Sequence, residues 1–384
     1  MSKDANNVPA LRFKGFSDAW EKRKLGDVTK LITKGTTPRK QNGQGTINFI
    51  KVENISKGGN ISVTNKISFE EHQGYLARSV LQENDILFSI AGSLGRTAII
   101  SKSLLPANTN QALAIIRLGS GDVKFVATYL SGTAVNEYIK RNPTTGAQPN
   151  ISLTQVASLH IDWPCLDEQR TIAKLFSKVN NLIAATQGKL DQLEMVKKAL
   201  LQHLFDQSMR FKGYSDPWEK RKLASLVHFI GTGKSTFTLH PSKDKIFRFP
   251  VLGSTSIIGY DSSYDVEGKM ILTARVGANA GNLYIYSGKA KITDNTVFLV
   301  TDTPSFLKAL LDHFDLKKIK FGTGQPLIKA SELKRLKLFV PCDPTELDSI
   351  QDCVLNINNL IAATQSKLSG LESLKKALLQ GLFI

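Results

Sequence analysis

Cysteine is scarce in this sequence, and its positions do not suit a metal site. The 384 residues include three cysteines, Cys165, Cys342 and Cys353, and no two of them form a C-x-x-C pair. Metal sites built from cysteine usually need such close spacing. Since Cys165 and Cys342 each follow a proline at matching places in the two halves of the chain, we expect small buried residues at the end of a strand.

Long apolar runs are absent as well. No stretch of about 18 apolar residues occurs, which is roughly the length that a membrane-spanning helix needs. The N-terminal sequence MSKDANNVPALRF lacks the apolar core of a signal peptide. We therefore expect a cytoplasmic protein without a membrane segment.

The motifs of several enzyme classes are missing. The chain has neither the Asn/Asp-Pro-Pro-aromatic motif nor the Gly-rich cofactor loop of a methyltransferase that flips adenine, and no D-x-n-E-x-K nuclease cluster stands out. The histidines are scattered without the spacing of metal ligands. They are His72, His160, His203, His228, His240 and His313. We therefore expect no catalytic residue, cofactor site or metal site on this chain.

One segment resembles part of a nucleotide-binding motif. Residues 231–236 read GTGKST, like the end of the phosphate-binding loop G-x-x-x-x-G-K-[ST], but His228 replaces the first glycine. The following TFTLHPSKD contains a proline and no helical period, so it offers no helix N-terminus to a phosphate. A DNA-contact loop fits better, because Lys234, Ser235 and Thr236 provide donors and the glycines let the backbone approach closely.

Positive charge is abundant. The chain carries 50 Lys and Arg against 33 Asp and Glu, a formal net charge of +17 at pH 7. A basic surface attracts phosphates and releases their counterions on binding. Nucleic acid is therefore the leading candidate partner, ahead of an anionic membrane surface.

The strongest pattern is a duplication. Residues 180–205, NNLIAATQGKLDQLEMVKKALLQHLF, return as residues 358–383, NNLIAATQSKLSGLESLKKALLQGLF, with twenty of twenty-six positions identical. Apolar residues recur at intervals of three and four in both copies, as in a coiled-coil seam. Two such helices in one chain are expected to pair. The residues predicted to pack against the partner helix are Leu175, Val179, Leu182, Leu193, Val196, Leu200, Ile357, Leu360, Leu371, Leu374 and Leu378.

Both stripes have polar interruptions and apolar additions. Thr186 and Lys189 interrupt the first stripe, and Thr364 and Lys367 the second. Further apolar positions make the face wider than one dimeric seam requires, so something besides the partner helix is expected to pack there. These positions are Ile183, Leu190, Leu201, Leu204, Ile361, Leu368, Leu379 and Leu382.

A second repeat precedes each variable stretch. Residues 12–25, RFKGFSDAWEKRKL, match residues 210–223, RFKGYSDPWEKRKL, at twelve of fourteen positions. Each repeat thus consists of a head, an insert and a long helix. The basic run from Lys22 to Lys24 in the first head fits either a phosphate contact or a solvated face.

The two inserts differ in sequence but follow one order of elements. In the first, we predict strands at 47–52, 85–90, 97–100 and 112–118 and a helix at 123–140. In the second, we predict strands at 270–274, 283–286 and 297–300 and a helix near 305–314. Each run is bounded by turn signals. We therefore expect the inserts to share a fold.

The head and the long helix are nearly identical in the two repeats, whereas the inserts differ. This pattern suits a modular recognition protein in which each insert recognises a different target. With the head motif, GTTP at 35–38, the GSLGR turn, the G-x-Q-P turn and the duplicated helix, the whole chain resembles the specificity subunit of type I restriction-modification systems. This resemblance implies a non-catalytic DNA-recognition subunit that binds a bipartite target with one recognition domain per half-site.

The resemblance also implies the architecture. The expected fold is α+β, with two similar target-recognition domains of mixed α/β structure joined by two long helices in an antiparallel coiled coil, as a pseudo-two-fold tandem repeat. The expected domains are residues 1–165 (head 11–25, insert 26–160) and 208–343 (head 209–223, insert 224–340). The long helices are expected at 166–207 and 344–384.

The implied partners are double-stranded DNA, two modification (methyltransferase) subunits docked on the paired helices, and two restriction subunits attached to that assembly. S-adenosylmethionine, ATP and magnesium would belong to the partner subunits, and this chain would bind no cofactor itself.

Base readout needs side chains with paired donors and acceptors, such as Arg for guanine and Asn or Gln for adenine. The predicted DNA contacts of the first insert are Lys34, Thr36, Thr37, Arg39, Arg96, Asn110, Gln111, Gln148 and Asn150. Those of the second are Lys234, Ser235, Thr236, Arg275, Asn279, Asn282, Asn295 and Gln325. Gln148 and Gln325 recur in both halves, so a shared turn or backbone contact suits them better than base readout. An ordinary loop role stays open for the others.

Two other classes stay open from the sequence. A coiled-coil adaptor without sequence-specific DNA binding would explain the helices, but not the net charge or the variation of the inserts. A P-loop nucleotide-binding enzyme would explain GTGKST, but it lacks the first glycine and the helix.

Overall fold

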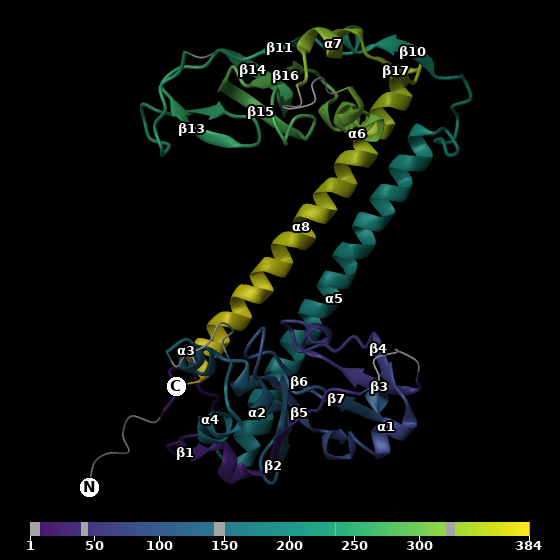
Figure 1. Ribbon diagram of the computed structural model, residues 1–384. Helices are drawn as coiled ribbons and strands as arrows, with labels where there is room; N and C mark the ends of the chain where they lie inside the picture. Colours follow the sequence, from purple (N-terminus) through teal and green to yellow (C-terminus); the bar gives the residue numbers. More distant parts are fainter. Residues whose placement is uncertain (1–7, 40–44, 142–149, 235, 320–326, 384) are drawn as a thin grey trace. The chain divides into compact units, whose positions relative to one another are not determined.

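The computed structural model describes residues 8–39, 45–141, 150–234, 236–319 and 327–383. The chain divides into two compact units. Unit 1 comprises residues 1–187 and 367–384, and unit 2 comprises residues 188–366. Each unit therefore contains one insert, part of the first long helix and part of the second (Figure 1).

The first half of the chain alternates short strands with short helices before the first long helix. Its strands are β1 (Glu21–Lys24), β2 (Thr29–Lys34), β3 (Ile47–Ile50), β4 (Asn65–Ile67), β5 (Ile86–Ser89), β6 (Thr97–Ile99), β7 (Ala107–Thr109), β8 (Leu113–Leu118) and β9 (His160–Trp163). Its helices are α1 (Phe69–Gln73), α2 (Val123–Leu130), α3 (Thr133–Arg141), α4 (Leu153–Ser158) and the long α5 (Leu166–Phe205).

Unit 1 is built on a four-stranded sheet, β2-β8-β5-β6, with apolar clusters on both faces. Successive side chains of a strand point to opposite faces. Phe88 of β5 therefore joins the cluster of α2 and α5, while its neighbour Leu87 joins the cluster that includes Ile50 of the second sheet, β4-β3-β7. All four residues of β5 are buried, which explains the run of three apolar residues, Ile86 to Phe88, that begins the strand.

The second half repeats this plan with longer strands. Its strands are β10 (Glu219–Lys222), β11 (Phe229–Thr232), β12 (Phe249–Leu252), β13 (Ile257–Asp261), β14 (Val266–Ala274), β15 (Leu283–Ile292), β16 (Thr296–Val300) and β17 (Lys337–Val340). Its helices are α6 (Pro304–Phe314), α7 (Ala330–Arg335) and the long α8 (Pro344–Leu382).

The sheet of unit 2 has the order β11-β16-β14-β15-β12-β13. Its first four strands repeat the order β2-β8-β5-β6 of unit 1, so the expectation of a shared fold is confirmed. The continuous β15 pairs with both β14 and β12, where unit 1 uses the separate strands β6 and β7. The α6 helix packs on the face that includes Ile271, and Met270 and Leu272 face the other way.

The helix predicted at 123–140 is wrong in its continuity. The chain instead forms α2 and α3, separated at Ser131 and Gly132. Asp122 caps the start of α2 by accepting the N–H of Phe125 at 2.9 Å. A Cβ at position 132 would lie 2.9 Å from the carbonyl oxygen of Tyr129, so the tight turn between the helices favours glycine.

In unit 1 a buried carboxylate ties the head to the start of α5. Strand β1 pairs antiparallel with β9, which leads into that helix. Glu168 accepts Arg12 Nε at 2.8 Å and Trp20 Nε1 at 3.1 Å. Its side chain is 1% exposed. The head is therefore a fixed part of the unit.

Unit 2 has the same arrangement at the start of α8. Strand β10 pairs antiparallel with β17, and Glu346 accepts Arg210 Nε at 2.9 Å and Trp218 Nε1 at 3.2 Å. The glutamate is again 1% exposed. The repeated head sequence thus encodes a repeated contact.

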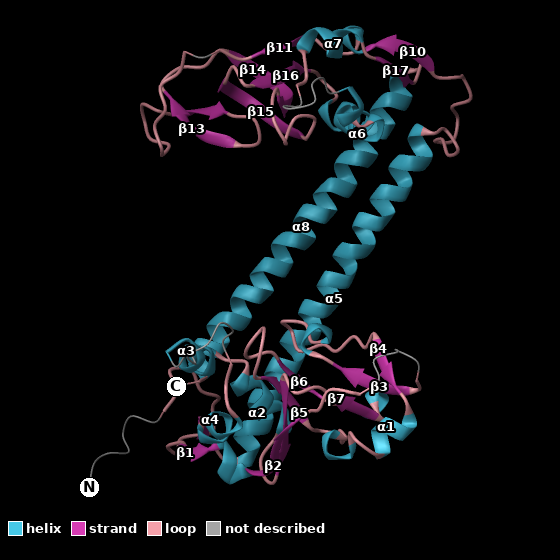
Figure 2. Cartoon of the chain, viewed as in Figure 1, coloured by secondary structure: helices cyan, strands magenta, loops and turns pink. Residues whose placement is uncertain are grey.

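The two long helices run antiparallel, as expected. In unit 1 the start of α5 and the end of α8 share a core, where the rings of Phe176 and Phe383 stack with centroids 5.9 Å apart. In unit 2 the end of α5 and the start of α8 share another core, which contains Leu204 and Val354. Figure 2 shows both helices as long uninterrupted elements. None of the helices in the described ranges is long and apolar enough to cross a membrane.

The buried row of each helix, called the seam below, follows alternating intervals of four and three residues. On α5 the seam is Ile172, Phe176, Val179, Ile183, Thr186, Leu190, Leu193, Lys197, Leu200 and Leu204, all buried or half-buried. On α8 it is Ile350, Val354, Ile357, Ile361, Thr364, Leu368, Leu371, Lys375, Leu378 and Leu382. The two rows occupy matching positions of the repeat.

The predicted packing stripe is partly wrong, because it mixes two rows. Leu182 and Val196 are 50% and 55% exposed, and Leu360 and Leu374 are 53% and 48% exposed. They belong to a second row with the same alternating spacing, called the outer row. Its members are Leu182, Ala185, Lys189, Gln192, Val196 and Ala199 on α5, and Leu360, Ala363, Lys367, Gly370, Leu374 and Ala377 on α8, all exposed. Leu175 is half-buried outside both rows, against the core of unit 1.

The cysteines are also placed differently from the prediction. Cys165 and Cys342 are exposed, and Cys353 is half-buried. The first two stand in the short connections after β9 and β17, past the strand ends, where the chain turns into a long helix. The proline before each cysteine is buried and the thiol is not.

Candidate nucleic-acid interface

The loops that follow β2 and β11 are held in the same way. The residue after Gly35 donates its N–H to the carbonyl of Thr109 at 3.0 Å, and the residue after Gly233 donates to Ile292 at 2.9 Å. A Cβ at either glycine would lie 2.1 Å from that same carbonyl oxygen. Only glycine fits so close an approach. The two loops therefore start from equivalent, fixed positions.

The first loop exposes only some of the predicted contacts. Lys34 and Arg39 are exposed, and the Arg39 guanidinium lies 4.1 Å from the ring centroid of Tyr75. Thr36 is buried, and its hydroxyl accepts the Arg78 Nε at 2.9 Å. Thr36 therefore shapes the loop from inside, and the two cations remain available to a ligand.

A hollow of about 640 Å³ in unit 1 brings several predicted residues together. Arg96, Asn110 and Gln111 line it, together with Glu53 and Ser93. Sequence reasoning missed the last two. The GSLGR turn signals Ser93, whereas nothing in the sequence links the turn that carries Glu53 to the other segments.

The side chains that line this hollow differ in whether their polar groups are already hydrogen-bonded. Arg96 donates to the carbonyl of Ile55 at 2.7 Å, so it stabilises the wall of the hollow. The Gln111 side-chain oxygen accepts the Thr37 hydroxyl, and Asn110 Oδ1 accepts an N–H of its own turn at 3.2 Å. The amide nitrogens of Asn110 and Gln111 have no partner among the residues that the structure describes. They are donors available to a base edge or a phosphate.

In unit 2 three segments meet beside the end of β14. Arg275 donates its N–H to the carbonyl of Asn295 at 2.8 Å, and its own carbonyl accepts the N–H of Ile328 at 2.8 Å. The turn that follows carries Asn279 and Asn282. Apart from Ile328, all of these side chains are exposed.

The equivalent segments of unit 1 meet in the same way. Ile90 donates its N–H to Ala112 at 2.9 Å and accepts the N–H of Ile151 at 2.9 Å. Asn150 pairs with Ala91 in an isolated bridge beside this junction. The backbone frame is therefore common to both units, while unit 1 has a buried isoleucine where unit 2 has the exposed Arg275.

Three predicted contacts, Gln148, Ser235 and Gln325, lie outside the described residues. Thr236 is exposed. Residues 236–248 contain no helix, as the proline and the lack of a helical period predict. Within the described ranges, no three His, Cys, Asp or Glu side chains gather closely enough to hold a metal ion.

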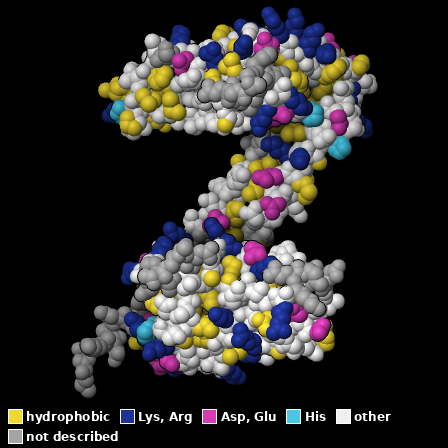
Figure 3. All heavy atoms as spheres, viewed as in Figure 1, with side chains coloured by type: hydrophobic (Ala, Val, Ile, Leu, Met, Phe, Trp, Pro, Cys, Tyr) yellow, Lys and Arg dark blue, Asp and Glu magenta, His cyan; other side chains and the backbone are white. Residues whose placement is uncertain are grey.

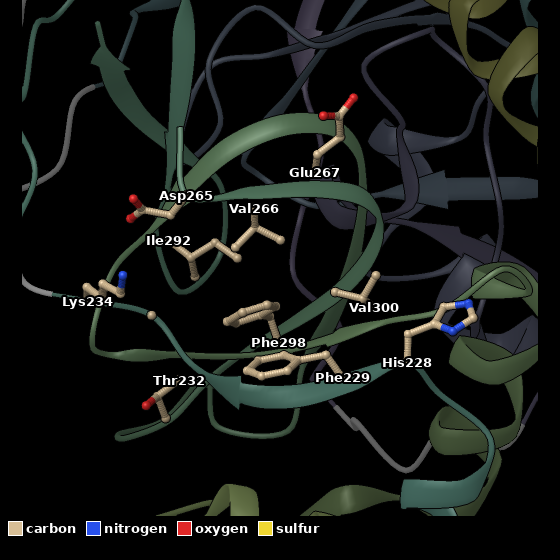
Figure 4. Close-up of a pocket in the computed structure, with 11 residues that line it drawn as sticks. His228, Phe229, Thr232, Lys234, Asp265, Val266, Glu267, Ile292, Phe298 and Val300 are labelled. Atoms are coloured by element: carbon tan, nitrogen blue, oxygen red, sulfur yellow. The ribbon is translucent and has the colours of Figure 1, made fainter. Parts of the chain in front are cut away.

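A separate hollow of about 400 Å³ lies on the sheet of unit 2 (Figure 4). The rings of Phe229 and Phe298 form part of it, with centroids 5.1 Å apart. Lys234 lines it as well, together with the carboxylates of Asp265 and Glu267. Two carboxylates and an apolar wall oppose binding of a polyphosphate.

Comparisons with known proteins agree on one family. The sequence model described as "Type I restriction modification DNA specificity domain" matches residues 17–195 and 215–382. The chain is 24% identical to a putative type I restriction enzyme MjaX specificity subunit of Methanocaldococcus jannaschii, over 84% of this chain and 74% of that protein. It is 22% identical to the type I restriction enzyme MjaVIII specificity subunit of the same organism, over 94% of this chain and 91% of that protein.

A solved structure is similar in fold. The crystal structure of a type I restriction-modification S subunit from M. genitalium matches with a TM-score of 0.72 and 16% sequence identity, over 98% of this chain and 99% of that one.

Proposed function

Since the chain belongs to the type I restriction-modification DNA specificity family, it is a DNA-recognition subunit of such a complex, and we propose that each unit contacts one half-site of a bipartite duplex target. The observation that supports this assignment is the shared junction of three segments, with different side chains presented on one backbone frame. A fixed frame sets the position of the protein on DNA, and variable side chains select the bases.

The proposed contacts are the predicted residues that are accessible in the structure. In unit 1 they are Lys34, Arg39, Asn110, Gln111 and Asn150. In unit 2 they are Lys234, Thr236, Arg275, Asn279, Asn282 and Asn295. The amides and Arg275 suit base edges, and the lysines suit phosphates. Thr37, Thr36 and Arg96 support the loops from within.

The outer row supports a docking role for the long helices. Its exposed apolar and small residues repeat at coiled-coil spacing on both α5 and α8, so each helix has a second face on which a further helix can pack. We assign this face to two modification subunits, one for each repeat, and expect two restriction subunits to join that assembly. Met195, which is 66% exposed, adds apolar surface next to the outer row of α5.

The chain is not catalytic in this assignment. Methyl transfer and ATP-dependent cleavage belong to the partner subunits, which would hold S-adenosylmethionine, ATP and magnesium. The hollow in Figure 4 is lined by two carboxylates and an apolar wall, which do not suit a polyphosphate.

Exchange of one insert tests the assignment of units to half-sites. Residues 26–160 are replaced by the corresponding insert of another member of the family, and both chains are expressed with the cognate modification subunit. Sequencing of methylated adenines should show that one half of the target changes and the other stays the same. The exchange of residues 224–340 is the matched control, and it should change the opposite half.

Two results would count against this function. A simultaneous change of both half-sites would contradict the assignment of one unit to each half. A parent complex that neither methylates nor prefers any DNA sequence would favour an adaptor that binds only proteins.

A further inference from the structure

A strongly basic surface lies at one end of unit 2, on segments of the chain other than the loops assigned above. Strands β10 and β17 and helix α7 form it, and it is called the basic ribbon below. Its cations are Lys220, Arg221, Lys222, Lys334, Arg335 and Lys337, all exposed. The same three elements contain only two acidic residues, Glu219 and Glu332. Figure 3 shows Lys and Arg side chains gathered on this end of the unit.

Most of these cations have no carboxylate partner. Arg221 is paired with Glu219 at 3.6 Å, and both side chains are largely exposed, so the pair contributes little. Within the described part of the chain, no ion pair is formed by Lys222, Lys334, Arg335 or Lys337. The charge of the ribbon is therefore not neutralised by the protein.

The strand register places two of these lysines directly opposite each other. Lys222 of β10 pairs with Lys337 of β17 in the antiparallel ladder. Like charges in directly opposed positions destabilise a two-stranded ribbon. Two residue pairs further along, Lys220 lies over the ring of the half-exposed Phe339, 5.6 Å from its centroid. An anion bound across the strands would relieve this repulsion.

Unit 1 has the same head sequence but not the same surface. Strand β1 also reads EKRK, but β9 and α4 contain no lysine or arginine. There Lys24 faces His160, and Lys22 faces the buried Asp162. The additional cations of unit 2 come from Lys334, Arg335 and Lys337. The basic ribbon is thus specific to one half of the chain.

The basic ribbon is separate in the chain from the loops assigned to base contacts in unit 2. Strand β17 ends at Val340 and α8 begins at Pro344, so the ribbon lies where this helix begins. The assigned base contacts lie instead in the turns between β14 and β16. A phosphate bound by the ribbon would therefore belong to DNA beyond the bases that these turns read.

We propose that the basic ribbon binds the phosphates of duplex DNA that flanks the target on the side of unit 2. This inference rests on the proposed function and adds a contact that is independent of base sequence. Each neutralised phosphate contributes about 0.9 to the slope of log affinity against log salt concentration. Three cations, Lys334, Arg335 and Lys337, would therefore contribute about 2.7 to this slope.

The test uses the complex with modification subunits and a duplex that carries its methylation target. The variant replaces Lys334, Arg335 and Lys337 with Gln. Between 50 and 200 mM salt, the parent complex should lose about 40-fold more affinity than the variant, as follows from three phosphate contacts. Trimming the flank on the side of unit 2 should weaken the parent but not the variant. Trimming the opposite flank should weaken both equally.

Two control variants separate this contact from general charge and from misfolding. Replacement of Lys14, Lys30 and Lys102 of unit 1 with Gln changes the net charge equally and should leave the effect of the unit 2 flank intact. The charge-conserving variant Lys334→Arg, Arg335→Lys, Lys337→Arg should bind like the parent. Its failure to do so, with a lowered melting temperature in both ribbon variants, would overturn the proposal in favour of a structural role.

The remaining outcomes also decide the question. An unchanged salt slope and an unchanged effect of the flank in the Gln variant would overturn the proposal. So would an unchanged slope with lost binding of a restriction subunit, because the ribbon would then be a protein interface. If the parent complex prefers no DNA sequence, the proposed function fails. The dependence of affinity on salt concentration, measured on any duplex, then still supports or overturns the phosphate contact of the ribbon.

Discussion

Glu168 and Glu346 show how much one side chain can organise in this protein. Each carboxylate is 1% exposed and accepts hydrogen bonds from a guanidinium and an indole. The side-chain hydrogen bonds to the glutamates raise the pKa of Arg12 and Arg210, so both guanidinium groups keep their positive charge. Removal of one partner from a buried ion pair leaves the other charge uncompensated.

We expect Glu168→Gln to lower the free energy of unfolding of unit 1 by about 3 kcal/mol, because Arg12 loses its buried counter-charge. Hydrogen exchange should accelerate in the head 11–25 and much less in the head 209–223. Glu346→Gln should produce the reverse pattern. The exposed Glu194, replaced by Gln, serves as the control. Equal protection of both heads in all variants would contradict a local role of the carboxylates.

The sequence shows this contact only in part. The sequence repeat alone shows that the three residues of this contact are duplicated: Arg12, Trp20 and Glu168 correspond to Arg210, Trp218 and Glu346. Repetition does not say which residues touch, because Glu168 is distant from the head along the chain. The burial of both glutamates depends on the β1–β9 and β10–β17 pairings, which are set by the tertiary structure.

At the scale of the elements, each long helix has two rows of residues, the seam and the outer row, with the same alternating intervals of three and four. Leu182 and Ile183 are adjacent, and either can continue an apolar stripe at intervals of three and four. The sequence therefore predicts the helices and their pairing but leaves the choice of row open. The structure buries the row that contains Ile183, Leu190 and Lys197. A lysine in the buried row is the least expected feature, because charged side chains rarely occupy such positions.

Burial lowers the pKa of Lys197 and of Lys375, and these lysines occupy the same seam position in the two repeats. A lowered lysine pKa means that the folded state binds protons less tightly than the unfolded chain. The resulting cost is fully present at neutral pH and disappears as pH rises above about 10, the ordinary lysine value. Both residues are therefore destabilising in the free chain at neutral pH.

We expect Lys197→Met and Lys375→Met each to raise the free energy of unfolding by about 1 kcal/mol at pH 7, since an apolar side chain of similar length fills the position. Thermal unfolding from pH 7 to pH 10 measures the effect, and the gain should shrink as pH rises. Lys189→Met in the exposed outer row is the matched control and should change stability little. A gain that is the same at both pH values would show that charge burial is not its cause.

At the scale of the whole chain, the end of each long helix contacts the start of a head in the same way. Leu11 donates its N–H to Gly381 at 2.7 Å in unit 1, and Met209 donates to His203 at 3.0 Å in unit 2. These residues occupy equivalent positions of the repeat. In unit 2 three residues, 206–208, connect Phe205 to Met209. The same connection should therefore be able to join Phe383 to Leu11.

A circular permutant tests this equivalence. It begins at Met209, runs to Phe383, continues through Asp-Gln-Ser to Leu11 and ends at Phe205. We expect it to melt within a few degrees of the parent and to direct methylation to the same target, because Phe205 and Phe383 stay in their cores and both heads are kept. A permutant opened between Gln187 and Gly188 is the control, and it should be less stable because the cut interrupts α5. A marked loss of stability in the first permutant would contradict the equivalence of the two junctions.

The site was less predictable than the fold, for a physical reason. Frame positions such as Gly35 and Gly233 can be inferred, because close backbone approach requires glycine. Loop side chains carry no periodicity, so Arg96 and Arg275 look alike in sequence. In the structure, Arg96 donates a hydrogen bond to the carbonyl of Ile55, whereas the side chain of Arg275 is exposed. Only the fold separates a supporting residue from a contacting one.

The shared cores have one more consequence. Leu382 and Phe383 complete the core of unit 1, although they end the second repeat, and Leu204 and Phe205 complete the core of unit 2, although they end the first. This is the reciprocal exchange of a domain-swapped dimer, held within a single polypeptide. A gene with one repeat would encode a chain whose core is completed only by a second copy of itself. The resulting homodimer would carry two identical inserts and bind a palindrome, and duplication with fusion would have released the two half-sites to diverge.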